Sequence, residues 1–280
     1  MPASASLPSV VSVSTQSGGA IVVQDVALAF EDNQVLDGIS FQLQHGETKA
    51  VFGVAGAGKS IILKLALGLL KPDAGRIWVL GEEVSALPEE QLFALRRKIG
   101  MVFQESALFD SMTVRDNVAF RLIEEGGSSP EDLEERVREA LRFVELEQTL
   151  DMFPGELSGG MRRRVAIARA IITKPEILLY DSPTGGLDPV TSTTIVELLV
   201  KQRDVYRSSS LLVTHRLQDA FTMASHSFDR ATNRMCPLTP GSRSQVPMSF
   251  LILRDGKVIF DGDVQELTRT KDEYIREYIS

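Results

Sequence analysis

The chain has 280 residues, of which 43% are hydrophobic and 24% are charged, close to the average of globular proteins. This length accommodates one large domain or two small ones around a substantial core. The formal net charge of -8 argues against a general nucleic-acid binder, because neutralising phosphates requires clustered Lys and Arg. The single cysteine, Cys236, excludes an internal disulfide and agrees with a reducing compartment.

The first 19 residues are rich in Ser and lack the basic and apolar regions of a secretory signal. We therefore expect residues 1–19 to form a disordered tail and the chain to stay in the cytoplasm. No segment approaches the roughly 20 consecutive apolar residues that cross a bilayer. The chain is not expected to span a membrane by itself.

Residues 21–53 contain three short runs in which apolar and polar residues alternate, separated by Asp-Asn and His-Gly breaks. Such alternation predicts strands with one buried face, and we expect all three to be antiparallel. After Gly53 the pattern changes, because leucines crowd residues 63–70. That composition predicts a buried helix after a glycine loop.

The clearest helix is predicted over residues 129–149, where Ser129 can cap the N-terminus and Pro130 suits the first turn. Two fully apolar runs, residues 177–180 and 211–213, each end close to a polar residue that they can deliver to a site. Buried parallel strands have this pattern.

The C-terminal part is predicted in three segments. Residues 227–249 are rich in Pro, Ser and Arg without periodicity, which predicts an irregular insertion. Residues 250–262 are expected to form a β-hairpin. Residues 266–280 have the mixed polarity of a surface helix, and its two tyrosines are candidates to dock it.

Residues 53–60 read GVAGAGKS, the pattern of a phosphate loop between a strand and a helix. Its glycines let the backbone amides surround phosphate oxygens, and the helix N-terminus adds partial positive charge. Lys59 is expected to reach the β- and γ-phosphates and Ser60 to bind Mg²⁺. The predicted ATP ligands here are Gly53, Val54, Ala55, Gly56, Ala57, Gly58, Lys59, Ser60 and Ile61.

Residues 156–171, ELSGGMRRRVAIARAI, resemble the signature of ABC ATPases. From about residue 20 to residue 228 the chain contains the motifs of that family in its order: Phe30, the phosphate loop, Gln104, LSGGM, Asp181, Leu187-Asp188 and His215. The resemblance implies an α/β fold with a RecA-like P-loop NTPase core of ABC type, an antiparallel β subdomain and a helical subdomain at about residues 105–162. It also implies one ABC ATPase domain over residues 20–265.

The resemblance further assigns roles to single residues. Phe30 matches the aromatic that stacks on adenine, and the alternative is an ordinary core aromatic of a strand. Asp181 and Gln104 match Mg²⁺ ligands beside Ser60, and His215 matches the histidine that contacts the γ-phosphate and the attacking water. Ser158, Gly159 and Gly160 match residues that cap the γ-phosphate of ATP held by the opposite subunit, so a complete site needs two chains.

Ser182 departs from the family pattern, which has a glutamate directly after the aspartate. A serine hydroxyl can orient water but cannot accept its proton, and loss of a positioned base typically costs about 10² to 10⁴ in rate. Three explanations are open: slow turnover supported by His215 and Gln104, a glutamate-bearing partner subunit, or a substitute carboxylate such as Glu105 or Asp188. We expect slow hydrolysis, and the alternative is an ATP-dependent clamp without turnover.

The stretch ESALFDSMTVRDNVAFRL, which starts at Glu105, and the methionine of LSGGM are similar to the ATPases of Mla and Mce lipid-transport systems. This similarity implies a separate membrane permease that docks near residues 105–125, with Phe109 and Met112 as apolar anchors. It also implies an Mce-type lipid-binding protein as an indirect partner and a peripheral location at the cytoplasmic face of the inner membrane. The second ATPase subunit is either an identical or a different chain.

Two remaining observations bear on whether the chain binds nucleic acid. The run from Arg162 to Arg164 falls on the first turns of the signature helix, where family resemblance or a solvated face explains it better than a DNA-binding patch. A cassette acting on DNA or ribosomes would usually carry a coiled-coil insertion, tandem ATPase domains or zinc cysteines, and this sequence has none. We therefore predict no nucleic-acid partner.

Overall fold

A central sheet of six strands organises the computed structural model, which describes residues 18–31, 33–127, 129–239 and 244–279. The strand order is β12-β11-β3-β8-β7-β6, and all neighbours are parallel except the β11 and β12 pair. The bounds are β3 Thr48–Gly53, β6 Ile99–Val102, β7 Ile177–Asp181, β8 Ser209–Val213, β11 Met248–Arg254 and β12 Lys257–Asp263. Strands β3 and β8 are buried along their whole length, as strands covered on both faces are.

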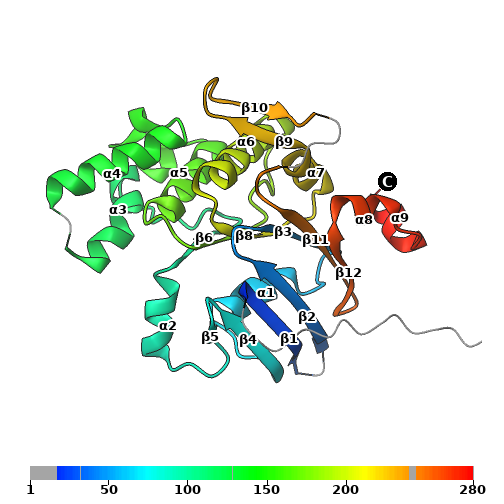
Figure 1. Ribbon diagram of the computed structural model, residues 1–280. Helices are drawn as coiled ribbons and strands as arrows, with labels where there is room; N and C mark the ends of the chain where they lie inside the picture. The colour runs from blue at the N-terminus through cyan, green and yellow to red at the C-terminus, as the bar shows by residue number, and fades with distance from the viewer. Residues whose placement is uncertain (1–17, 32, 128, 240–243, 280) are drawn as a thin grey trace, which may run out of the picture.

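A second, antiparallel sheet packs beside the central one and appears in blue and cyan in Figure 1. Its order is β2-β1-β4-β5, with bounds β1 Gly19–Phe30, β2 Asn33–Gln44, β4 Ala74–Val79 and β5 Glu82–Glu83. Helix α1, Lys59–Ala66, lies between the two sheets, because its buried Leu63 shares one apolar cluster with Ile39 and Val51. This cluster fixes the helix that carries the phosphate loop.

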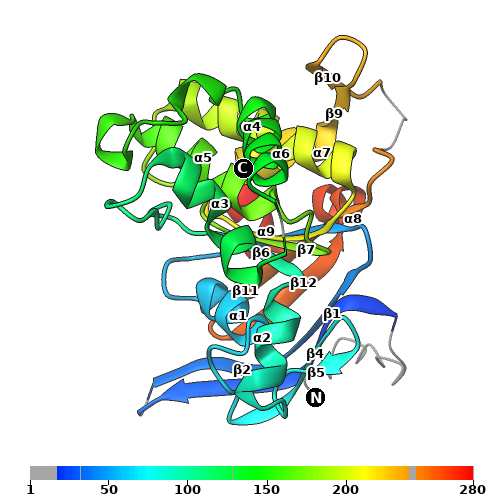
Figure 2. The ribbon, with the colours of Figure 1, turned by 90° about the vertical axis from the view of Figure 1, so that its left-hand side faces the viewer.

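The first helix after α1, residues 89–96, packs in this same cluster through Leu92 and Leu95. The later helices cover the other face of the central sheet, as Figures 1 and 2 show in green and yellow. Their buried side chains, such as Val118 and Val165, join Tyr180 and Leu212 of the sheet in a second cluster. The bounds are α2 Glu89–Arg96, α3 Val114–Glu125, α4 Pro130–Phe143, α5 Gly159–Ile171, α6 Pro189–Tyr206 and α7 Leu217–Ser225, with 3₁₀ turns η1 Glu147–Thr149 and η2 Pro154–Glu156. None of the helices in the described residues is long and apolar enough to cross a membrane.

The expectation that all three runs of residues 21–53 are antiparallel is wrong for the third. Strands β1 and β2 do pair antiparallel, but β3 leaves that sheet and pairs parallel with β8 and β11. The reason is visible in its burial, since β3 has no solvent-facing side. Alternation of residue types did not reveal this difference over only six residues.

The predicted helix over residues 129–149 ends earlier than expected. Helix α4 is capped by Ser129 with Pro130 in its first turn, as predicted, but it stops at Phe143. Glu145 has a φ of 60°, which breaks the helix before η1 begins at Glu147. A left-handed residue cannot continue a right-handed helix.

The prediction of an irregular insertion over residues 227–249 is also wrong in part. Strands β9 His226–Asp229 and β10 Arg234–Pro237 form an antiparallel pair that packs on α6. β11 begins at Met248, inside the predicted insertion. Strands β9 and β10 are only four residues long, too short for an alternation of apolar and polar residues to be recognised.

The C-terminal segment forms two short helices, not the one expected over residues 266–280. The bounds are α8 Val264–Arg269 and α9 Glu273–Ile279, so the first begins before the predicted boundary at residue 265. Buried Leu267 and Ile275 pack with Phe250 in a third cluster, where both tyrosines are partly buried. The predicted tail falls outside the described residues up to residue 17, and β1 already begins at Gly19.

Candidate active site

The polar motifs predicted from the sequence meet at one edge of the central sheet. Four neighbouring parallel strands, β3, β8, β7 and β6, end there. The glycine loop follows β3, His215 comes shortly after β8, and Gln104 comes shortly after β6. Asp181 is the last residue of β7, and Ser182 is next. Ligand sites of open parallel sheets form at this carboxyl edge.

The glycine loop has the backbone conformation that its composition predicts. Gly56 and Gly58 have φ values of 82° and 88°, which side chains disfavour. A Cβ on Gly58 would lie 2.7 Å from the Leu36 side chain, so the loop also needs glycine for its contact with β2. Helix α1 begins directly after Gly58 and directs its N-terminus towards the loop.

Lys59 folds back over the loop. Its Nζ donates hydrogen bonds of 2.8 Å to the carbonyl oxygens of Gly53 and Val54. Burial lowers the pKa of Lys59, and the Asp181 carboxylate opposes that effect. The ammonium group is therefore held above the amides where phosphate oxygens are predicted to bind.

Ser60 and Asp181 bring two oxygen ligands together. The Ser60 hydroxyl donates to a carboxylate oxygen of Asp181 at 3.0 Å, across the junction of α1 and β7. Mg²⁺ prefers oxygen ligands and usually keeps waters and substrate phosphates in its shell. This pair fits the predicted ion, and no cluster of three or more His, Cys, Asp or Glu offers a rival metal site within the described residues.

Ser182 lies in a tight turn behind this pair. It is 6% exposed, has a φ of 47°, and its carbonyl accepts a hydrogen bond from the Gly185 amide at 2.9 Å. A Cβ on Gly185 would lie 3.4 Å from the Ser182 side chain and 3.6 Å from Cγ of Gln104. Ser182, Gly185 and Gln104 are thus packed against one another, although Gln104 itself is exposed.

The two carboxylates considered as substitutes for the missing glutamate differ in their surroundings. Asp188 caps helix α6, where its carboxylate accepts bonds from the hydroxyl and the amide of Thr191 at 2.5 and 3.0 Å. These bonds lower the pKa of Asp188, which makes it a weaker proton acceptor. Glu105 is exposed beside Gln104.

Phe30 and His215 are both exposed, which excludes the core role considered for Phe30. Phe30 is 45% exposed at the end of β1 and pairs with Asn33 across the hairpin. The start of β2 touches the loop through Val35 and Leu36. The hairpin of β1 and β2 thus connects Phe30 to the residues that contact the loop. His215 comes after β8, with Thr214 between them.

A family model described as ABC transporter matches residues 36–185, more than half of the chain. The chain belongs to the ABC transporter family. Its structural neighbours are ABC cassettes, and its α/β architecture is that of a RecA-like P-loop fold. The predicted fold class is confirmed.

The ABC chain is similar to curated proteins of different transport systems. It is 36% identical over 279 residues to the protein TRIGALACTOSYLDIACYLGLYCEROL 3, chloroplastic, of Arabidopsis thaliana, a match that covers 92% of this chain and 72% of the relative. It is 39% identical over 201 residues to the methionine import ATP-binding protein MetN of Carboxydothermus hydrogenoformans, which covers 71% of this chain and 59% of the relative.

Solved structures of ABC cassettes superpose on most of the chain. The structure of cbiO1 from Clostridium perfringens, part of the ABC transporter complex cbiONQ, has a TM-score of 0.75 at 26% identity and covers 93% of this chain and 94% of its own. A dimeric post-hydrolysis state of the cassette MJ0796, bound to ADP and Pi, has a TM-score of 0.72 at 28% identity. That match covers 87% of this chain and 98% of the other.

The signature of this ABC chain begins helix α5. The Ser158 hydroxyl caps the helix by accepting a bond from the Met161 amide at 3.2 Å. Ser158 and Gly159 are exposed, whereas Gly160 is buried. A Cβ on Gly160 would lie 2.3 Å from Thr191, so this glycine permits close contact with α6.

Of the two explanations considered for Arg162 to Arg164, family resemblance and a solvated face, the second is wrong for Arg163, which is buried. Arg162 donates to the Leu157 carbonyl at 2.6 Å, and Arg164 donates to the Val144 carbonyl at 3.3 Å. Arg163 is only 4% exposed. The run anchors the signature helix to surrounding backbone, because guanidinium groups carry enough donors to satisfy several carbonyls.

Two residues near the site were missed from the sequence. Asp219 of α7 is buried, accepts a bond from the Thr184 hydroxyl and pairs with Arg216 at 3.5 Å, so it ties α7 to the turn after Ser182. The Tyr278 hydroxyl accepts a bond from the Gly53 amide at 3.3 Å. Neither contact has a signal in local spacing, since Tyr278 lies 225 residues from Gly53.

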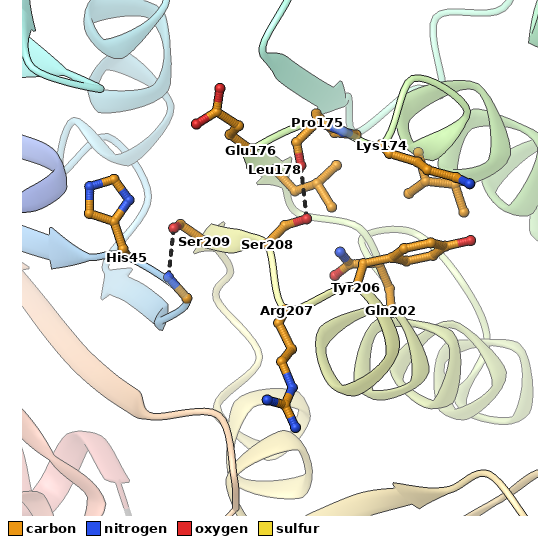
Figure 3. Close-up of a pocket in the computed structure, with 12 residues that line it drawn as sticks. His45, Lys174, Pro175, Glu176, Leu178, Gln202, Tyr206, Arg207, Ser208 and Ser209 are labelled. Carbon is orange, nitrogen blue, oxygen red and sulfur yellow. Dashed lines mark hydrogen bonds between the residues drawn. The ribbon is translucent and has the colours of Figure 1, made fainter.

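A polar cavity of about 300 Å³ lies at the opposite end of the sheet, where β7 and β8 begin. Figure 3 shows Gln202 and the paired serines around it. The Ser208 hydroxyl donates to Pro175 O at 2.8 Å, and Ser209 accepts from the Gly46 amide at 2.9 Å. These groups stabilise the strand starts, and none of the predicted site residues lines this cavity.

Proposed function

We propose that the chain is an ABC ATPase subunit that dimerises around two ATP molecules and drives a separate membrane permease. Hydrolysis is slow because Ser182 replaces the usual glutamate. The observation that carries the proposal is the convergence of the loop, Lys59, Ser60 and Asp181 at one sheet edge. A decayed site would not keep these contacts.

Each group has a distinct part in this reaction. Lys59 and the loop amides bind the phosphates, and the Ser60 and Asp181 oxygens hold Mg²⁺. When bound, the ion neutralises charge on the phosphates. Exposed Gln104 and His215 orient the attacking water, which Ser182 cannot deprotonate.

Two chains are needed for a complete site. Ser158, Gly159 and Gly160 stand at an exposed helix N-terminus, which favours an anion. No group of the same chain is proposed to fill that position, so the γ-phosphate of ATP bound by the second subunit is the natural ligand. The dimeric cassette among the similar structures supports this arrangement.

The proposed cargo is phospholipid or another hydrophobic molecule, as in Mla and Mce systems. Support comes from the Arabidopsis relative, whose name refers to the lipid trigalactosyldiacylglycerol and whose match covers 92% of this chain. Methionine is the competing cargo, from the name of the second relative. A lipid system would place the ATPase at the cytoplasmic face of the inner membrane, with an Mce-type protein further along the path.

The permease is proposed to dock near residues 105–125. Phe109 is 42% exposed there and packs against Phe120 in a tilted arrangement with ring centroids 4.7 Å apart. Met112 beside it is half-buried. An exposed aromatic supported by a second ring is a suitable apolar anchor for a partner helix.

The test is single-turnover ATP hydrolysis by the purified chain, its Ser182→Glu variant and its Lys59→Ala variant, with bound nucleotide measured separately. We expect slow turnover that requires Lys59 and rises at least several-fold with Ser182→Glu. ATP binding without any turnover in the native chain would favour the second candidate, a non-hydrolysing clamp or the degenerate partner of a heterodimer. Equal rates for the native chain and Ser182→Glu would refute the missing-base argument.

A further inference from the structure

Arg163 is a buried cation at the centre of the site that the nucleotide chemistry does not use. It lies in the second turn of α5, the helix that begins at the signature, and its side chain is 4% exposed. Arginine is rarely buried so completely unless it is paired. Within the described residues, however, it forms no ion pair, and its Nε has no hydrogen-bond partner.

The guanidinium group is held by three backbone carbonyls. Its Nη1 donates to Ser182 O at 3.1 Å and to Phe103 O at 3.4 Å, and its Nη2 donates to Gly185 O at 3.4 Å. Phe103 precedes Gln104, and Gly185 packs on both Ser182 and Gln104. One side chain therefore links the signature helix to the loop that carries Gln104 and to the turn at Ser182, where the family has its catalytic glutamate.

The geometry favours a role in positioning over a role in stability alone. Burial lowers the pKa of Arg163, and the Glu105 carboxylate opposes this effect, so removal of the guanidinium from water costs free energy. An apolar side chain in this place would avoid that cost, but the three carbonyl oxygens would lose their hydrogen bonds to the planar guanidinium group. Lysine keeps the charge but presents it from one atom, which cannot reproduce the planar fork.

We propose that Arg163 is a positioning residue that ties the placement of Ser182 and Gln104 to that of the signature helix. When the signature engages the γ-phosphate of the second subunit, movement of α5 is transmitted through this guanidinium to the Gln104 loop and the Ser182 turn. The proposal rests on the proposed function, because it assigns a route by which the partner's nucleotide reaches the hydrolytic groups.

The experiment compares Arg163→Gln, Arg163→Lys and Arg164→Gln in the full chain. Arg164 is the matched control, because it is also a partly buried arginine of α5 that binds a backbone carbonyl, but its partner is Val144 in the helical region. ATP affinity and the single-turnover rate are measured for each variant, in the native background and with Ser182→Glu. Thermal unfolding confirms that each variant folds.

For Arg163→Gln we expect at least a tenfold lower rate with ATP affinity changed less than threefold, partial recovery in Arg163→Lys, and no such split in Arg164→Gln. A double variant with Ser182→Ala should be no slower than the slower single variant, because the two residues act as one unit. Equal losses of rate and affinity, or an unchanged rate, would overturn the proposal.

Hydrogen exchange of backbone amides tests the positioning role of Arg163 without relying on ATP turnover. In Arg163→Gln the amides of Ser182, of residues 184–186 and of residues 103–106 should exchange at least fivefold faster, with no change in Arg164→Gln. Unchanged exchange at these amides would refute the inference even if the chain never hydrolyses ATP. Conversely, a native chain without Lys59-dependent turnover but with the expected exchange pattern refutes only the proposed hydrolysis.

Discussion

Replacement of Tyr278 by phenylalanine removes one hydroxyl and leaves the aromatic ring in place. That hydroxyl accepts the hydrogen bond from the Gly53 amide at 3.3 Å, where β3 turns into the phosphate loop. Burial raises the pKa of Tyr278, and the Gly53 bond opposes this, so the hydroxyl is uncharged at neutral pH. Gly53 is buried, and the variant therefore leaves a buried donor without its partner.

The size of the effect follows from this single bond. An unsatisfied buried donor costs about 1–3 kcal/mol. Because this bond is long, at 3.3 Å, we expect a cost at the lower end of that range, about 1 kcal/mol. The free loop of the variant can relax to recover this loss, whereas ATP binding requires the native turn. Since 1.4 kcal/mol corresponds to a factor of ten, we expect ATP to bind about fivefold more weakly to Tyr278→Phe.

The assay is equilibrium binding of a fluorescent ATP analogue, with Tyr274→Phe as the control. The Tyr274 ring stacks on Tyr278 with centroids 6.1 Å apart and lies under Arg254, so this variant also loses one hydroxyl from α9. We expect its affinity to stay native. If Tyr278→Phe unfolds at a lower temperature but binds the analogue with native affinity, the bond only holds the helix and the reasoning is wrong.

Two further variants test other parts of the site. The pKa of Asp188 is lowered because the Thr191 hydroxyl and amide bind its carboxylate. This group therefore stabilises the fold above its unfolded pKa, and the stabilisation is lost as pH falls through the lower folded value. Asp188→Asn should thus show a smaller fall in melting temperature below about pH 4 than the native chain, and parallel curves for the two proteins would contradict this. Phe30 is 45% exposed, so Phe30→Ala should scarcely change stability but should weaken ATP binding by about 1–3 kcal/mol if the ring stacks on adenine. Tripolyphosphate, which lacks the base, should bind both proteins equally, and equal losses for the two ligands would exclude stacking.

The residues that the sequence predicted best are those whose chemistry is local. The phosphate loop is one continuous stretch in which glycine spacing encodes the backbone turn, and Gly56 and Gly58 have the expected conformation. The apolar runs before Asp181 and His215 were long enough to be read as buried strands, which they are. Because both runs were expected to be parallel strands, the residues that follow them were expected at the same edge of the sheet.

What the sequence did not reveal depends on contacts between distant segments. The side of the molecule to which Arg163 points is fixed by the packing of α5 on α3 and β6, and a run of three arginines contains no sign of it. The same applies to Tyr278, whose partner lies at the other end of the chain. Strand β3 was assigned to the wrong sheet because pairing is decided by strands that come much later.

The position of β3 also bears on how the protein is made. The strand that ends in the phosphate loop lies between β8 and β11, so its two neighbours are residues 209–213 and 248–254. Both follow the segment 36–185 that the family model matches. A nascent chain on the ribosome holds the complete loop sequence early, yet its strand has no hydrogen-bonded partner until most of the protein has emerged. Such long-range pairing is slow, and a fragment limited to residues 36–185 should not bind ATP.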